Sequence, residues 1–337
     1  MSKAHENVER LLSGSMPSRC VIVAELGVNH DGSTERALRL LEAARDAGAD
    51  AVKLQLFTPD ELCSSVSRAE EIRMLERLRL SDAAHARIVA AARELDLPVF
   101  ATSFDEPSLE LLRRLEIPLV KIGSGEVTHT PFLARVARTG LPVILSTGAC
   151  ELADVDRAVS ALRENGCTRL SLLHCVSAYP PPDDQLHLRL IPALAARYRD
   201  CTVGFSDHSL GSVAAPAAVA LGARIIEKHL THDRSAEGPD HAASADPAGF
   251  AEMVTAIRRV EAMLGEDGKA IRACEGSVGR CVVAGRDLPA GHLIAVDDLA
   301  YKRAGAGLRP YAAADLVGRR TKDAVGRDVE ITGMNVA

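Results

Sequence analysis

The sequence predicts a parallel (β/α)8 barrel followed by a small β-rich module, and two observations indicate this fold. Short runs of β-branched residues alternate with longer amphipathic segments, and the alternation repeats eight times between residues 20 and 265. Eight such units are the number that a (β/α)8 barrel requires. A doubly wound sheet also alternates strand and helix, but no glycine-rich phosphate-binding fingerprint follows the first expected strand. Barrel closure is therefore favoured.

Each expected strand is a short apolar run that ends in small or polar residues. In chain order the runs are CVIVAELG, AVKLQLF, PVFATSF, LVKIGSG, PVILSTG, LSLLHCVS, CTVGFSD and IIEKHL. The segments between them have helical periodicity, and several end at a glycine suited to a helix C-cap. The clearest helical segments cover residues 34–50, 108–116, 132–140 and 153–166.

The pattern changes near residue 280. Beyond it come short polar and apolar fragments with frequent glycine and little helical periodicity, as expected of a turn-rich β module. We therefore divide the chain into an N-terminal extension (1–19), a barrel (20–266), a linker (267–280) and a C-terminal domain (281–337).

Composition and charge favour a small-molecule partner. The formal net charge is -6, and basic residues are dispersed among acidic ones, so neither nucleic acid nor an anionic membrane is an expected partner. The first nineteen residues lack the apolar core of a signal peptide, and no later stretch approaches the apolar length of a membrane span. We expect a cytoplasmic protein.

The cysteines are expected to be reduced and structural. The chain has eight of them, with no CxxC pair and no zinc-finger spacing, and several lie inside apolar runs. A disulfide framework or a cysteine metal site is therefore disfavoured.

Polar residues at the strand ends fall on one side of each strand. Barrel chemistry takes place at the carboxyl ends of the strands, where alternate residues face the lumen. By this alternation Lys53 shares a side with Gln55, and Ser206 and His208 do the same on the seventh strand, as Glu227 and His229 do on the eighth. Asp207 and Lys228 have the opposite parity. We expect Asp207 to brace a loop or a neighbouring residue, and Lys228 to extend through the helix layer to solvent.

Two histidines are candidates for a metal site. His208 and His229 end neighbouring strands, so their imidazoles can converge on a divalent cation. Barrel closure places the first strand beside the eighth, which brings Glu25 near both. A single histidine at a strand end is more often a satisfied structural residue, but two on adjacent strands favour the metal.

A set of lysine and hydroxyl side chains is a candidate anion site. Each would alone be read as a solvated strand end, but together they supply two cations and several donors around one mouth, as a phosphate and a carboxylate need. The run KIGSGE adds glycines that let backbone amides approach an anion. The set consists of Lys53, Thr102, Lys121, Ser124, Ser146, Ser177 and Ser206.

With these motifs in place, the chain resembles the sialic acid synthase family, which condenses phosphoenolpyruvate with N-acetylmannosamine or a related amino sugar. The tail VVAGRDLPAGHLIAVDDLAYKRAGAG resembles the antifreeze-like (SAF) domain of that family. The other motifs that carry the resemblance are AELGVNHDG, GADAVKLQLF, KIGSGE, PVILSTG, LLHCVSAYPPP, VGFSDHS, EKHLTHD and GPDHAAS.

The resemblance implies a role for each candidate residue. His208 and His229 would hold a divalent metal, most often Mn2+, with Mg2+ or Co2+ as alternatives, and the anion set would bind phosphoenolpyruvate. Glu25 and Glu126 would be the acid and base. The sugar would contact Gln55, Tyr179 and Asp240, together with an arginine, Arg303, from the antifreeze-like domain of the other subunit in a domain-swapped homodimer.

Other functions remain open at this point. The acceptor could be a 6-deoxy-diacetamido hexose leading to legionaminic or pseudaminic acid, since such sugars differ by only a few substituents. A phosphorylated acceptor would require a second basic cluster, and the sequence shows none. A catalytically silent carbohydrate-binding relative should have lost Glu25, His208 or His229, and all three are present.

Overall fold

The computed structural model describes residues 19–265, 268, 275, 278–305 and 307–337. The predicted N-terminal extension lies outside these residues except for Arg19, and so does most of the predicted linker. The chain forms two compact units, which meet in the sequence between Gly265 and Glu266. Each unit is described by itself below.

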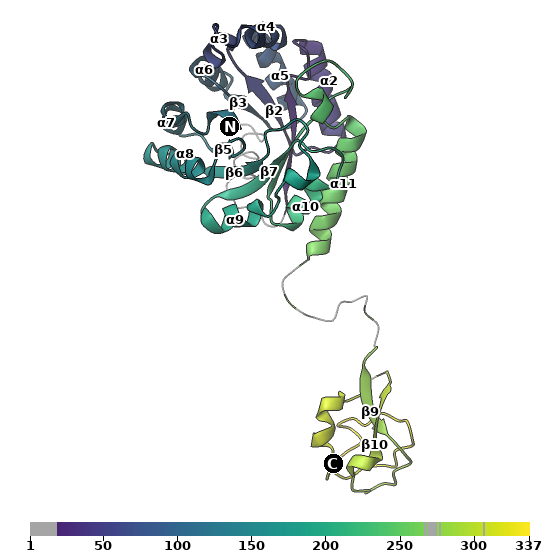
Figure 1. Ribbon diagram of the computed structural model, residues 1–337. Helices are drawn as coiled ribbons and strands as arrows, with labels where there is room; N and C mark the ends of the chain where they lie inside the picture. Colours follow the sequence, from purple (N-terminus) through teal and green to yellow (C-terminus); the bar gives the residue numbers. More distant parts are fainter. Residues whose placement is uncertain (1–18, 266–267, 269–274, 276–277, 306) are drawn as a thin grey trace. The chain divides into compact units, whose positions relative to one another are not determined.

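The first unit is the predicted barrel. Its eight strands are all parallel and hydrogen-bonded in sequence order, and β8 closes onto β1. Figure 1 shows the strands enclosed by the helices that connect them. The strands are β1 (Val21–Gly27), β2 (Ala51–Leu56), β3 (Val99–Ser103), β4 (Val120–Ile122), β5 (Val143–Ser146), β6 (Leu170–Cys175), β7 (Thr202–Asp207) and β8 (Ile225–His229).

Helices follow the strands and cover the outside of the barrel. Several begin at a side-chain cap, as Ser33, Ser81 and Asp105 each accept a hydrogen bond from a backbone amide in the first turn. Their ends also follow the prediction, because Gly140 and Gly166 have positive φ angles of 73° and 103° just beyond the last turn. The helices are α2 (Thr34–Asp46), α3 (Pro59–Leu62), α4 (Ala69–Leu78), α5 (Asp82–Glu94), α6 (Glu106–Arg114), α7 (Thr130–Arg138), α8 (Leu152–Glu164), α9 (Leu190–Arg197), α10 (Ala214–Ala220) and α11 (Pro247–Leu264).

The strand register determines which side chains meet at the mouth. Glu25 of β1 pairs with Lys53 of β2 on one side and with His229 of β8 on the other. On β7, Ser206 pairs with Glu227. Closure of the barrel therefore brings residues from both ends of the sequence to one place.

An apolar layer between strands and helices holds the barrel together. Side chains such as Leu40, Ile88, Leu112 and Leu133 are fully buried there against the outer faces of the strands. Burial of each such side chain contributes roughly 1.5–3 kcal/mol. The layer gives the strand ends a rigid base.

The second unit is a small β module with its own core. Strands β9 (Arg280–Ala284) and β10 (Leu299–Arg303) pair antiparallel, and short 3-10 turns η4 (Val296–Asp298) and η5 (Pro310–Asp315) connect the remaining loops. The core comprises Val282, Ala284, Leu288, Ile294, Ala313, Leu316, Val325, Ile331 and Val336. In the described part of the chain, no helix is long and apolar enough to cross a membrane.

Candidate active site

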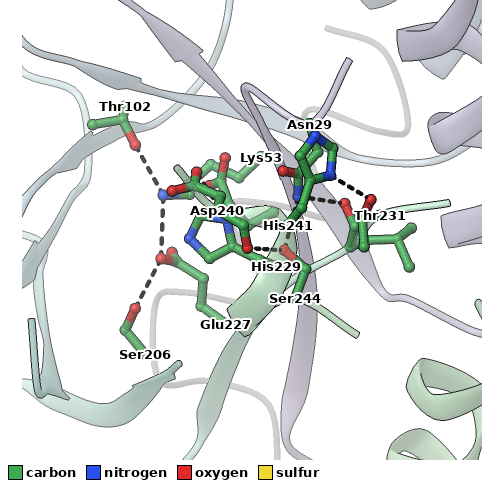
Figure 2. Close-up of polar contacts among 12 residues, drawn as sticks. Asn29, Lys53, Thr102, Ser206, Glu227, His229, Thr231, Asp240, His241 and Ser244 are labelled. Atoms are coloured by element: carbon green, nitrogen blue, oxygen red, sulfur yellow. Dashed lines mark hydrogen bonds and ion pairs between the residues drawn. The ribbon is translucent and has the colours of Figure 1, made fainter. Parts of the chain in front are cut away.

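A buried ionic network occupies the lumen at the carboxyl ends of the strands. Glu227 Oε1 lies 3.1 Å from Lys53 Nζ and 3.1 Å from Lys121 Nζ, and it accepts a hydrogen bond of 3.1 Å from Ser206 Oγ. Lys53 Nζ also donates to Thr102 Oγ1 at 2.9 Å. Figure 2 shows Lys53 in contact with Thr102 and Glu227, and Glu227 in contact with Ser206. The network joins β2, β3, β4, β7 and β8, so both lysines are held in place before any ligand binds.

Several polar atoms in this lumen remain unsatisfied. Glu25 is fully buried, and its Oε2 lies 2.5 Å from Lys53 Nζ, but neither carboxylate oxygen makes a well-aligned hydrogen bond with a described residue. Glu227 Oε2 and Ser146 Oγ also lack a hydrogen-bond partner among the described residues. Buried polar atoms normally have partners, so such a group of exceptions indicates a site built to receive a ligand or water.

Burial shifts the charge equilibria of the network. It lowers the pKa of Lys53 to about 7, because desolvation of the ammonium outweighs the attraction of Glu227. For Glu227, burial opposes ionisation, but the two lysines together hold its pKa well below the usual range. The lumen therefore contains a lysine that can change its protonation state near neutral pH.

The two histidines converge as the sequence predicts. The His208 and His229 rings have centroids 5.3 Å apart, and the ring of Tyr179 lies 4.1 Å from that of His208. His208 Nδ1 lies 3.1 Å from the carbonyl oxygen of Val176, which can only accept, so Nδ1 carries a proton and Nε2 is the nitrogen that could bind a metal when the ring is neutral. The Asp240 carboxylate lies 3.3 Å from His229 Nδ1, but Nδ1 has no aligned hydrogen bond with a described residue.

These features fit a divalent metal held by two imidazoles. Burial, with the neighbouring His208, holds the pKa of His229 well below its ordinary value, so its ring is neutral as a ligand must be. The Val176 carbonyl orients the His208 ring as an outer-shell group does in a metal site. Among the described residues, no group of three or more His, Cys, Asp or Glu side chains is arranged to hold a metal ion.

The remaining hydroxyls line the lumen beside Gly148. Ser124 Oγ accepts a hydrogen bond of 3.0 Å from the Gly148 amide. A β-carbon at position 148 would lie 2.4 Å from Ser177 Oγ and 2.9 Å from Ser124 Oγ, so only glycine leaves room for both hydroxyls. The structure thus brings Ser124 and Ser177 together.

The predicted sugar contacts meet at another glycine. A β-carbon on Gly27, whose φ is +48°, would lie within 3.1–3.3 Å of Glu25 Oε1, Asp240 Oδ2 and Gln55 Nε2. These three side chains therefore surround one small space next to His229. The centroid of the Tyr179 ring lies 5.9 Å from that of His229, and Tyr179 is 45% exposed.

The two remaining predicted residues belong to η1 (Ser124–Glu126) and to the second unit. Glu126 ends η1, and its carboxylate lies 3.3 Å from His129 Nδ1. Arg303 ends β10 in the second unit and is exposed.

The prediction for Lys228 on the outer face of β8 is wrong, and the prediction missed Glu227 on the lumen face. Lys228 does not reach solvent: it is 1% exposed, and its Nζ lies 2.9 Å from Asp207 Oδ2. Asp207 does brace its loop, because it accepts hydrogen bonds from the amide and hydroxyl of Ser209 at 2.8 and 2.6 Å. Glu227 was absent from the predicted site, although its parity with His229 pointed into the lumen.

A (β/α)8 barrel whose mouth holds paired lysines, paired imidazoles and an unsatisfied carboxylate has the features of an enzyme that acts on small anionic molecules. Sequence comparison identifies the family. The NeuB family matches residues 40–269, and the SAF domain matches residues 279–334. The chain belongs to the NeuB family and carries a C-terminal SAF domain, as the resemblance implied.

Characterised relatives cover nearly the whole chain. The N,N'-diacetyllegionaminic acid synthase of Legionella pneumophila is 38% identical over 324 residues, covering 89% of this chain and 90% of the relative. The N-acetylneuraminate-9-phosphate synthase of Drosophila melanogaster is 33% identical, covering 97% of this chain and 98% of the relative.

A solved structure agrees in fold. The N-acetylneuraminic acid synthetase of Leptospira borgpetersenii aligns with a TM-score of 0.72 and 33% identity, covering 76% of this chain and 88% of that one. The family therefore comprises enzymes named for the synthesis of nine-carbon sugar acids.

Proposed function

We propose that the protein condenses phosphoenolpyruvate with an N-acetylmannosamine-type amino sugar, forming a nine-carbon sialic acid and releasing phosphate. The observation that carries this proposal is the buried pair Lys53 and Lys121, which converge on Glu227 Oε1 beside two facing imidazoles. Two ammonium groups in a lumen suit a ligand with a phosphate and a carboxylate.

Phosphoenolpyruvate would bind in the lysine half of the lumen. Its anionic groups would take charge-assisted hydrogen bonds from Lys53 and Lys121. Hydroxyls would complete the pocket, and the Ser146 hydroxyl, which is buried without a hydrogen-bond partner among the described residues, is available for this purpose. The remaining donors are Thr102, Ser124, Ser177 and Ser206.

The sugar would bind in the histidine half. A divalent cation on His208 and His229, most often Mn2+ in this family with Mg2+ or Co2+ as alternatives, would act as a Lewis acid toward the aldehyde oxygen. Gln55, Tyr179 and Asp240 would fix the sugar so that its aldehyde carbon faces the methylene carbon of phosphoenolpyruvate.

The reaction then needs a base for water. Attack of the methylene carbon on the aldehyde forms the carbon–carbon bond and leaves positive character at C2 of the former phosphoenolpyruvate. Water adds at C2 and gives up a proton, and the tetrahedral adduct expels phosphate to leave the keto acid. Of the two predicted carboxylates, Glu25 is favoured for the proton, because it is buried in the lumen with unsatisfied oxygens, whereas Glu126 contacts His129.

The identity of the acceptor is the finer question. The 38% identity to a named N,N'-diacetyllegionaminic acid synthase supports a 6-deoxy-diacetamido hexose as the alternative acceptor. A relative named N-acetylneuraminate-9-phosphate synthase adds a phosphorylated mannosamine to the acceptors worth testing. A silent carbohydrate-binding relative would not need the unsatisfied Glu25.

The test is a product assay with a panel of acceptors. The purified chain, with Mn2+, Mg2+ or Co2+, is incubated with phosphoenolpyruvate and each of three acceptors: N-acetylmannosamine, its 6-phosphate or a 2,4-diacetamido-6-deoxy-hexose. We expect phosphate release matched by a nine-carbon acid in the mass spectrum. Binding of a sugar without phosphate release would instead support the silent relative.

We propose, on the family resemblance, that the active form is a domain-swapped homodimer in which Arg303 of one chain completes the sugar site of the other. Mixing inactive His208→Ala and Arg303→Ala chains tests this, since one site of a swapped heterodimer has an intact barrel and an intact arginine. Activity should partly return after subunit exchange. If none returns, the swap is wrong.

A further inference from the structure

Loop 230–246, which follows β8, carries Asp240 to the histidines and is tied to the barrel at both ends. Thr231 N donates to Ala245 O, and Ala245 N donates to His229 O, each at 2.9 Å. Between these ties the loop runs through exposed residues before returning at Asp240. The position of the Asp240 carboxylate therefore depends on what holds the returning part.

Two chains of hydrogen bonds hold it, and both begin in the loop after β1. In the first, Asn29 Nδ2 donates to Leu230 O at 3.0 Å and to Ser244 Oγ at 2.8 Å, and Ser244 Oγ donates to the carbonyl oxygen of Asp240 at 2.7 Å. Asn29 and Ser244 are 4% and 3% exposed, so water does not compete for these bonds. The Asp240 backbone is thus held by a buried amide.

The second chain runs through His241, the neighbour of Asp240. Its Nε2 lies 3.0 Å from Asp31 Oδ1, and its Nδ1 lies 2.7 Å from Thr231 Oγ1. Since a carboxylate only accepts, Nε2 donates to Asp31, and both ring nitrogens are engaged. Figure 2 shows the hydrogen bond between the His241 ring and Thr231.

The His241 ring is buried directly against Gly238. The ring is 2% exposed, and a β-carbon on Gly238 would lie 2.6 Å from its Cδ2. Such a distance would force the ring to move, although hydrogen bonds hold it at both nitrogens. Gly238 therefore leaves the space that the ring occupies.

We propose that Asn29 and His241 are positioning residues, which hold the Asp240 carboxylate against His229 and so set the affinity for the acceptor sugar. This inference rests on the proposed function of Asp240 as a sugar contact. Neither residue touches the lumen network, so binding of phosphoenolpyruvate should be independent of both. The loop after β1 would thereby affect the affinity for the sugar but not the affinity for phosphoenolpyruvate.

The first arm of the test measures the loop without catalysis. Amide hydrogen exchange is compared in the full-length wild type, His241→Phe and Gly238→Ala. We expect faster exchange across residues 238–244 in both variants, with the barrel strands unchanged. His174→Phe is the matched control, because it also replaces a buried histidine that is bonded through Nε2, at 2.7 Å to Leu186 O, but on the outer side of β6. Unchanged exchange in residues 238–244 would overturn the inference.

The second arm separates the two substrates. In His241→Phe and Asn29→Ala we expect KM for the sugar to rise between about tenfold and a hundredfold, with KM for phosphoenolpyruvate within about twofold. In an Asp240→Asn background, His241→Phe should add little, because the group that it positions has been altered. Equal effects on both substrates, or full additivity, would indicate a purely structural role and overturn the proposal.

The two arms distinguish failure of the proposed function from failure of the positioning role. If the wild type condenses no acceptor on the panel, the proposed function fails, while the exchange measurement still decides whether these residues hold the loop. Ser235→Ala, in the exposed part of the same loop, should leave both KM values unchanged. The Ser235 hydroxyl bonds only Asp233 among the described residues, and a change there would indicate that any disturbance of the loop suffices.

Discussion

Strands β7 and β8 carry two buried clusters of lysine and carboxylate, one on each face, and the clusters differ in how fully their polar atoms are paired. Toward the helices, Lys228, Asp207 and Ser209 satisfy one another. Toward the lumen, Glu227 is shared by two lysines while Glu25 lacks an aligned hydrogen bond among the described residues. We call the first the closed cluster, because its polar atoms are paired within the protein, and the second the open cluster, which we propose receives the ligands.

The largest expected effect comes from breaking the closed cluster. Lys228→Met leaves the Asp207 carboxylate buried without its cation, which should lower the free energy of unfolding by about 3–5 kcal/mol. Urea unfolding of the full chain measures this. The double variant Lys228→Met, Asp207→Leu should recover most of the loss, because no charge remains unpaired. A loss below about 1 kcal/mol in the single variant would contradict the comparison.

The same substitution in the open cluster should affect binding instead of stability. Lys121→Met leaves Glu227 with Lys53 and Ser206 as partners and keeps Lys53 beside Glu25, so the free energy of unfolding should change by less than about 1 kcal/mol. Loss of a charge-assisted contact, worth about 1.5–3 kcal/mol, should raise KM for phosphoenolpyruvate ten- to a hundredfold. Steady-state kinetics with each substrate varied in turn measures this. An equal rise in KM for the sugar would argue against the anion pocket.

The pH dependence of binding should identify the other lysine of the open cluster, Lys53. Burial lowers the pKa of Lys53 to about 7, so the free lumen loses this proton as pH rises through neutrality. An anion binds the ammonium form, and above pH 7 binding must therefore take up a proton. KM for phosphoenolpyruvate should rise between pH 7 and 9 by up to about tenfold per pH unit. Lys53→Met should flatten this profile, and an unchanged slope would contradict the assignment.

The smallest effects should come from two buried serines. Ser146 Oγ has no hydrogen-bond partner among the described residues, so Ser146→Ala should leave stability unchanged or slightly higher while KM for phosphoenolpyruvate rises by a few fold. Ser209→Ala removes a bonded hydroxyl and should cost about 1–2 kcal/mol of stability with no specific effect on KM. Thermal unfolding beside kinetics separates the two. A larger loss of stability in Ser146→Ala than in Ser209→Ala would contradict the interpretation that the Ser146 hydroxyl is unpaired in the lumen.

The sequence was sufficient for the barrel and for most of the mouth. Alternation of strand and helix predicted the fold, and the two-residue period predicted that Ser206 and His208 face inward while Asp207 does not. These inferences need only local geometry. Closure of the barrel then followed from the count of units, which placed Glu25 beside the histidines.

What the sequence could not predict depends on contacts across the lumen. Lys121 of β4 reaches Glu227 of β8 from the opposite side of the barrel, and no local pattern gives that separation. Lys228 was wrongly expected to reach solvent, because a long cationic side chain usually does so. The structure pairs it with Asp207 instead, and only the register of β7 with β8 reveals that partner.

This alternation of charge along β8 has a consequence for how the barrel assembles. If β8 joined its neighbours one residue out of step, Glu227 would turn into the apolar layer and Lys228 into the lumen, each away from its partner. An uncompensated buried ion costs several kcal/mol, so a barrel with this one-residue shift would be destabilised by both residues. The charged residues of β8 therefore favour its correct register during folding, in the absence of any substrate.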